Sequence, residues 1–125
     1  MKRSVLVVVL LGLTLAACGG GADAGAAIEG YIEAVVSQDM AAAQNASCGA
    51  WEASAQTEVR SFDGVSARLE DLSCTATGSE GDFTLVSCVG TIIATYQGED
   101  RPIDLSARDY LAANEGGAFR MCGYK

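Results

Sequence analysis

The first hydrophobic pattern of the chain has the period of a helix. Five apolar side chains take positions i, i+3, i+4, i+7 and i+8 of an amphipathic stripe: Ile28, Tyr31, Ile32, Val35 and Val36. Asp39 then stands where the N-cap of a second helix is expected, over residues 40–47, whose alanines favour helix. A third, short helix is expected over residues 51–60, with Trp51, Ala55 and Val59 on one face.

From residue 65 the apolar positions alternate, which is the period of a strand. Val65, Ala67 and Leu69 share one phase, and the apolar positions after residue 71 continue in the other phase. The alternation changes phase at Glu70-Asp71. This change predicts a β-bulge, a feature of curved sheets. Turn sequences at residues 78–82, 98–100 and 114–117 separate this strand from three more. These are a long strand over residues 83–97, a third strand that begins near Pro102, and a final strand over residues 118–124.

The order of these elements indicates an α+β fold. We expect N-terminal helices packed on a curved, four-stranded antiparallel sheet in which each strand pairs with the next. The third strand is expected to alternate Ile103, Leu105 and Ala107 with polar neighbours, and Pro102 is acceptable at its beginning.

Cysteines provide a second constraint on the fold. An even number of cysteines in a small exported domain predicts two disulfides, which four residues would form: Cys48, Cys74, Cys88 and Cys122. Three connectivities are possible. A turn centred near residue 81 places Cys74 opposite Cys88, and this leaves Cys48 at the end of the helical layer to pair with Cys122 on the last strand. No C-x-x-C pair is present, so neither a zinc site nor a redox centre is expected.

The N-terminal segment has the composition of an export signal. Lys2 and Arg3 precede an apolar run over residues 5–15. As a helix, this run would cover roughly 16 Å, about half of the hydrocarbon thickness of a bilayer. Residues 1–17 are therefore expected to be a signal peptide and not a transmembrane helix.

The end of this run resembles the lipobox of bacterial lipoproteins. Leu15-Ala16-Ala17-Cys18 is followed by three glycines and a small, polar stretch. The resemblance implies cleavage before Cys18, acylation of its thiol, a flexible tether over residues 18–25 and a folded domain over residues 26–125. The domain would then face the extracytoplasmic side of a bacterial cell membrane, held by its lipid anchor. The alternative is an ordinary secretory signal with a cysteine near its cleavage site by chance.

Charge and composition exclude several classes of ligand. The chain carries 16 acidic and 8 basic residues, a net charge of −8, and loss of Lys2 and Arg3 would make it −10. Such an acidic domain is repelled by nucleic acid, so no nucleic-acid partner is expected. Because histidine is absent, the commonest general base and metal ligand is missing, and we expect neither a metal nor a cofactor.

Two stretches resemble the ketosteroid isomerase-like (nuclear transport factor two-like) superfamily, a cystatin-like cone of helices over a curved sheet. The first runs from Tyr31 through Asp39, like that family's first helix and the aspartate that follows it, and the second is the closing stretch over residues 116–123. The resemblance implies that Tyr31 donates a hydrogen bond to a developing enolate. However, the family's Glu-Asp-Pro stretch has no counterpart here, where the chain reads Cys48-Gly49-Ala50-Trp51, and Tyr31 also fits a core or pocket-wall aromatic.

These observations predict a membrane-anchored binding or accessory domain without catalytic activity. It would hold a small apolar ligand or dock on another envelope protein. The alternative is an isomerase- or hydratase-type enzyme that uses Tyr31 as its oxyanion donor, and a purely structural role at the envelope is a third possibility.

Overall fold

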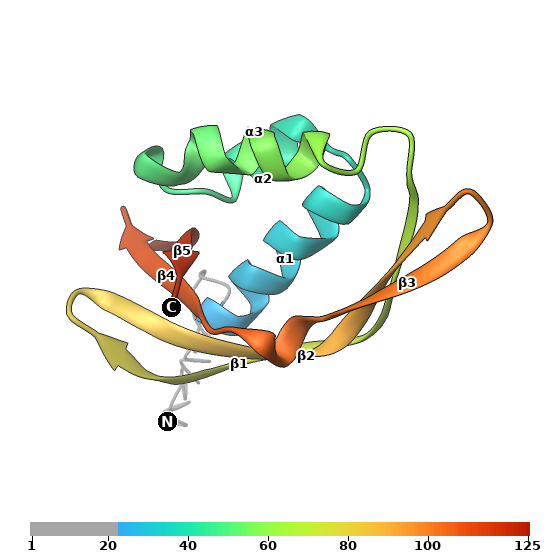
Figure 1. The fold of residues 1–125 in the computed structure, drawn as a ribbon. Coiled ribbons are helices and arrows are strands. Elements are labelled where there is room, and N and C mark those ends of the chain that lie inside the picture. The colour runs from blue at the N-terminus through green and yellow to red at the C-terminus, as the bar shows by residue number, and fades with distance from the viewer. Residues whose placement is uncertain (1–22) are drawn as a thin grey trace, which may run out of the picture.

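A computed structural model describes residues 23–125, which form an α+β domain (Figure 1). Three helices come first and lie on one face of an open sheet of five strands, which does not close into a barrel. The helices are α1 (Ala24–Val36), α2 (Met40–Asn45) and α3 (Glu52–Arg60), with the 3-10 turn η1 (Gly49–Trp51) before α3. The strands are β1 (Ser66–Glu80), β2 (Phe83–Tyr96), β3 (Glu99–Asp104), β4 (Tyr110–Glu115) and β5 (Ala118–Tyr124). The predicted fold class is confirmed.

Helix α1 lies in the hollow of the curved sheet (Figure 1). Its predicted apolar stripe is buried except for the half-buried Val36, and Ile28 and Tyr31 are among the least exposed side chains of the described residues. The helix begins at Ala24, two residues before the expected start of the domain, because the Asp23 carboxylate accepts a hydrogen bond from the backbone N–H of Ala26 at 2.7 Å. Asp39 caps α2 in the same way, as its position in the sequence predicts.

The sheet has one more strand than the sequence predicted. β1 and β2 pair along their length, while the other edge of β2 pairs first with β4 and then, beyond a gap, with β3. The expected third strand is interrupted by the 3-10 turn η2 (Leu105–Ala107), in which the Asp104 carboxylate accepts from the Ser106 backbone N–H at 2.9 Å. This turn buries Leu105 and redirects the chain into β4, so the prediction of a four-stranded sheet with a continuous third strand was wrong.

The bulge predicted at Glu70-Asp71 is confirmed. The register with β2 shifts there: Glu70 lies opposite Thr91, but Ser73 lies opposite Val89. Opposite the bulge, Gly90 has φ +113°, and a Cβ on it would lie 2.7 Å from the Asp71 carbonyl oxygen. Only glycine therefore allows the two strands to approach at the point where the sheet bends.

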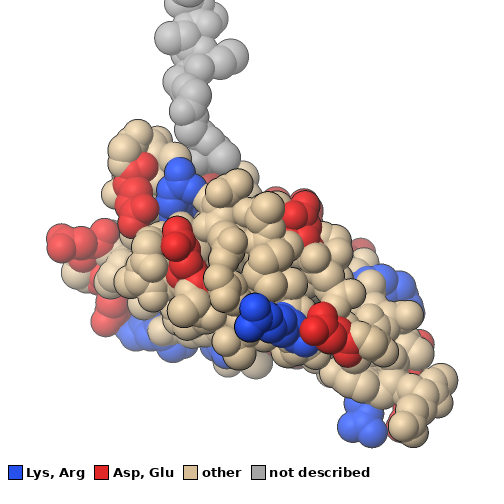
Figure 2. Space-filling model, turned by 90° about the horizontal axis from the view of Figure 1, so that it is seen from above, with Lys and Arg blue, Asp and Glu red and all other residues tan. Residues whose placement is uncertain are grey.

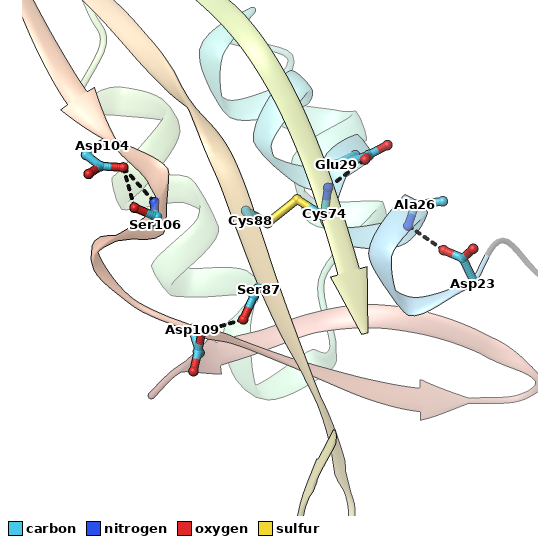
Figure 3. The surroundings of a disulfide bond; sticks show 9 residues. All are labelled: Asp23, Ala26, Glu29, Cys74, Ser87, Cys88, Asp104, Ser106 and Asp109. Carbon is cyan, nitrogen blue, oxygen red and sulfur yellow. Dashed lines mark hydrogen bonds between the residues drawn. A yellow bond between two sulfur atoms is a disulfide. The ribbon is translucent and has the colours of Figure 1, made fainter. Parts of the chain in front are cut away.

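Both predicted disulfides are present in the structure, with the predicted pairing. Cys74 and Cys88 lie opposite each other on β1 and β2, with their Cα atoms 4.1 Å apart (Figure 3). Cys48 and Cys122 join the segment before α3 to β5, with Cα atoms 5.3 Å apart. Beside this second bridge, the Cys48 backbone N–H donates to the Met121 carbonyl at 2.8 Å, so covalent and hydrogen bonds hold the helical layer to the same strand.

The disulfides bear on the location of the domain. The two disulfides indicate an oxidising, extracytoplasmic compartment. Among residues 23–125, no helix combines the length and the apolar character needed to cross a bilayer. On the face shown in Figure 2, acidic and basic side chains are interspersed with uncharged surface.

Candidate functional site

An open cavity of about 220 Å³ lies between α1, α3 and the bent part of the sheet. Much of its wall is apolar, and six side chains form this part: Ile32, Val35, Phe62, Ile92, Ile103 and Leu105. Most of them are also core residues, whereas Ile103 is 43 % exposed and marks the rim. A concave, largely apolar space that is open at one side is the usual form of a small-ligand site.

A carboxylate and two phenols form the polar end of this cavity. The Tyr31 hydroxyl donates to one carboxylate oxygen of Glu58 at 2.8 Å, and the Tyr124 hydroxyl donates to the other at 2.7 Å. The Trp51 indole N–H in turn donates to the Tyr31 oxygen at 3.0 Å. Each of the two oxygens of Glu58 therefore already accepts a charge-assisted hydrogen bond, which stabilises the ionised carboxylate.

Secondary structure brings these four side chains together from three distant segments. Tyr31 belongs to the buried stripe of α1, and Tyr124 closes β5. Glu58 follows Trp51, the N-cap residue of α3, by seven residues, about two helical turns, so the two side chains can meet along one side of the helix. The Trp51 and Tyr124 rings meet edge to face with centroids 5.3 Å apart, which fixes their relative orientation.

Arg108 lies at the mouth of the cavity, just after η2. Its guanidinium carbon is 3.4 Å from the centroid of the Tyr124 ring, a cation–π arrangement. The Tyr110 ring also packs on Tyr124, with the two ring centroids 5.3 Å apart. Arg108 is exposed and also lines the cavity, so its positive charge faces both solvent and the interior of the site.

The phenols of the site are poor acids. Burial raises the pKa of Tyr31 well above its ordinary value of 10.0, and the negative charge of Glu58 raises it further. Burial also raises the pKa of Tyr124, and Glu58 adds to the increase. The pKa of Tyr110 is raised by burial as well, although the nearby Arg108 guanidinium opposes this increase. All three side chains therefore stay neutral hydrogen-bonding groups at physiological pH.

The position of Tyr31 meets one requirement of the oxyanion role and conflicts with another. Its side chain lines the cavity and faces a second ionisable group, as an enzyme of this type needs. However, a phenol has a single proton, and Tyr31 donates it to Glu58. A developing oxyanion would have to displace this carboxylate, which is itself negatively charged.

The other residues singled out in the sequence lie elsewhere or outside the described residues. Asp39 caps α2, with its carboxylate on the Ala42 backbone N–H at 3.1 Å, and does not line the cavity. The four paired cysteines contribute to the framework of the domain and not to the cavity wall. Cys18 belongs to residues 1–22, outside the part of the chain that the structure describes.

Sequence reasoning missed Glu58, Arg108, Tyr110 and Tyr124 as residues of the site. Only Glu58 carries a local signal, its two-turn spacing from Trp51. Arg108 reaches the cavity because the chain turns at η2, and this turn was not predicted. Within the described range, no three side chains of the ligating types gather into a group able to hold a metal ion.

Comparisons of this chain with protein-family models, with curated proteins and with solved structures found no match.

Proposed function

We propose that this protein is an extracytoplasmic lipoprotein whose domain binds a small, largely apolar ligand without transforming it. The observation that carries this proposal is the open cavity of about 220 Å³, with its apolar wall and a few polar groups at one end. Most apolar side chains of the described residues are packed into a core, so an open apolar space beside that core favours an occupant.

The lipobox-like sequence at Leu15-Ala16-Ala17-Cys18 supports attachment to a membrane. Two or three acyl chains on one cysteine would hold the domain durably, since each buried methylene contributes about 0.8 kcal/mol. The disulfides agree with the compartment that such an anchor requires. In this proposal, the domain presents its cavity to molecules near the outer face of that membrane, or accompanies another envelope protein there.

The alternative proposal is an isomerase- or hydratase-type enzyme of the ketosteroid isomerase-like kind. The favouring observation is that Tyr31 and Glu58 share the cavity. The hydrogen bonds of the site argue against this enzyme. Tyr31 and Tyr124 both donate to Glu58, so Tyr31 has no proton left to donate to a substrate oxyanion. Binding without chemistry requires no such rearrangement, and we therefore prefer it.

Native mass spectrometry of the full chain, purified from its own host, tests the binding proposal. We expect a non-covalent adduct of one small organic molecule. Val35→Phe places extra bulk in the cavity wall and should abolish the adduct, while Val89→Phe, at a side chain 56 % exposed and outside the cavity, should retain it. Thermal unfolding of both variants shows whether they are folded. Repeated recovery without an adduct, or an adduct that survives Val35→Phe in the folded protein, would overturn the proposal.

A further inference from the structure

Two hydrogen-bond donors of the cavity, Arg108 and Tyr110, have no carboxylate partner among residues 23–125. No carboxylate of the described residues lies within 4.0 Å of the Arg108 guanidinium, whereas Arg68, Arg101, Arg120 and Lys125 each have such a partner. Arg60 also has none in this part of the chain, but it does not line the cavity. Tyr110 donates its hydroxyl proton to no described group. Arginine can only donate, so its proximity to Tyr110 leaves the phenol proton available.

The acids that face the same space already have donors. Glu58 accepts from Tyr31 and Tyr124, as described above. Asp104, at the rim, accepts from the backbone N–H and the hydroxyl of Ser106, at 2.9 and 2.7 Å (Figure 3). The cavity therefore combines satisfied acceptors with donors that lack a partner.

We propose that the cavity binds an organic acid, with the ligand's carboxylate on Arg108 and Tyr110 and its apolar body against the aliphatic wall. This inference deepens the proposed function and rests on it. A guanidinium presents paired N–H groups that match the two oxygens of a carboxylate. The phenol of Tyr110, two residues further along the chain, supplies a third donor from the cavity wall.

The size and placement of the groups limit the ligand further. The volume of about 220 Å³ is below the roughly 300–1,000 Å³ of pockets for drug-sized ligands. A cavity of this size has space for one ring or a short chain. Because Arg108 is exposed, the carboxylate would sit at the mouth and keep part of its hydration, which lowers the cost of desolvating it.

Three probes of one shape and different charge test this inference on the full chain. They are 3-phenylpropionate, its neutral amide and the corresponding 3-phenylpropylammonium ion. Trp51, the one tryptophan of the chain, donates to Tyr31 in the cavity wall, so its fluorescence reports occupancy. We expect the carboxylate to bind about tenfold more tightly than the amide, and the ammonium ion to bind most weakly.

Substitutions assign this preference to the proposed residues. Arg108→Gln should weaken binding of the carboxylate about tenfold and leave binding of the amide unchanged. Arg101→Gln is the matched control, because Arg101 is also an exposed arginine over a tyrosine ring, 5.6 Å from the centroid of Tyr96, but does not line this cavity. Tyr110→Phe should have a smaller effect in the same direction as Arg108→Gln.

The outcomes separate this inference from the function on which it rests. If the amide or the ammonium ion binds as tightly as the carboxylate, the cavity is a binding site but the preference for an anion is wrong. If Arg108→Gln leaves carboxylate affinity unchanged, the assignment to Arg108 is wrong. If none of the three probes changes the fluorescence of Trp51, the preference for an organic acid is overturned, while the binding function itself is decided by the native mass spectrometry described above.

Discussion

At the scale of single residues, the distinctive group is Glu58, a carboxylate held by two phenols at the end of an apolar cavity. Its oxygens accept from Tyr31 and Tyr124 at 2.8 and 2.7 Å. A charge beside a hydrophobic core is tolerated only when such donors replace water. The phenols therefore stabilise the carboxylate, and their protons are not available for a substrate.

Removal of one phenol should destabilise the domain measurably. Tyr31→Phe removes the donor to Glu58 and the acceptor of Trp51, and we expect a loss of about 2 kcal/mol in the free energy of unfolding. Urea unfolding, followed by circular dichroism, measures this loss. Tyr96→Phe is the control, since Tyr96 is 41 % exposed, and should change stability by less than about 0.5 kcal/mol. Equal losses in the two variants would show that the Tyr31 network contributes nothing.

The raised pKa values of the tyrosines predict loss of stability in alkali. Below an ordinary tyrosine pKa of 10.0 the phenols are neutral in both states, so their contribution is fully present. Above it, tyrosines of the unfolded chain ionise while Tyr31, Tyr110 and Tyr124 stay protonated in the fold, so the free energy of unfolding falls. Urea titrations from pH 7 to 12 should be flat to about pH 9.5 and then decline, and Tyr124→Phe should decline less steeply. A constant stability across this range would contradict the assignment.

At the scale of elements, the packing of α1 on β1 depends on a glycine. A Cβ at Gly25 would overlap the carbonyl oxygen of Cys74, and close by the Cys74 backbone N–H donates to the Glu29 carboxylate at 2.8 Å (Figure 3). The first turn of the helix therefore lies directly on the strand that carries the cross-strand disulfide. Gly30, in the same helix, has open space around its Cβ position.

These two glycines should respond to the same substitution with opposite signs. Gly25→Ala is expected to destabilise the domain by about 1–3 kcal/mol, because helix and strand must separate. Gly30→Ala should stabilise it by roughly 0.5–1 kcal/mol, as alanine is the better helix former. Thermal unfolding of the two variants makes the comparison, and a stabilised Gly25→Ala protein would contradict this contact.

Elements with a strong period of their own were predictable from the sequence, and the break in the third strand was not. The stripe of α1 and the phase slip at Glu70-Asp71 are properties of neighbouring residues, so both could be located. The alternation of Ile103 and Leu105 is the same whether the chain continues as a strand or turns at Asp104 to bury Leu105. The candidate site was predictable to the same extent. Tyr31 could be located because it belongs to a periodic helix, whereas Glu58 and Tyr124 reach it only through tertiary packing.

At the scale of the whole molecule, the two disulfides should differ in what they contribute. Cys48–Cys122 closes a separation of 74 residues and joins the helical layer to β5, while Cys74–Cys88 closes 14 residues within one hairpin. On the chain-entropy model, replacement of the first pair by alanine costs about 4 kcal/mol and of the second about 3 kcal/mol. Denaturant unfolding of the two double variants measures both values. A larger loss for the hairpin pair would contradict the role given to Cys48–Cys122.

The proposed location limits the ligand of the cavity. On this proposal, the ligand is a molecule found beside the membrane, outside the cytoplasm. A disulfide-bonded domain on a short tether would stay in the region next to the membrane surface. The acidic domain, whose net charge becomes −10 on loss of Lys2 and Arg3, would be kept from lying flat on anionic headgroups, so its cavity mouth would remain accessible.

The most direct test of the account is the intact mass of the natural protein under denaturing conditions. We predict a chain that begins at Cys18, with both disulfides formed and with the added mass of a diacylglyceryl group on that residue. A protein that keeps Met1, or one whose Cys18 carries no lipid, would contradict the proposal of a membrane-anchored binding domain.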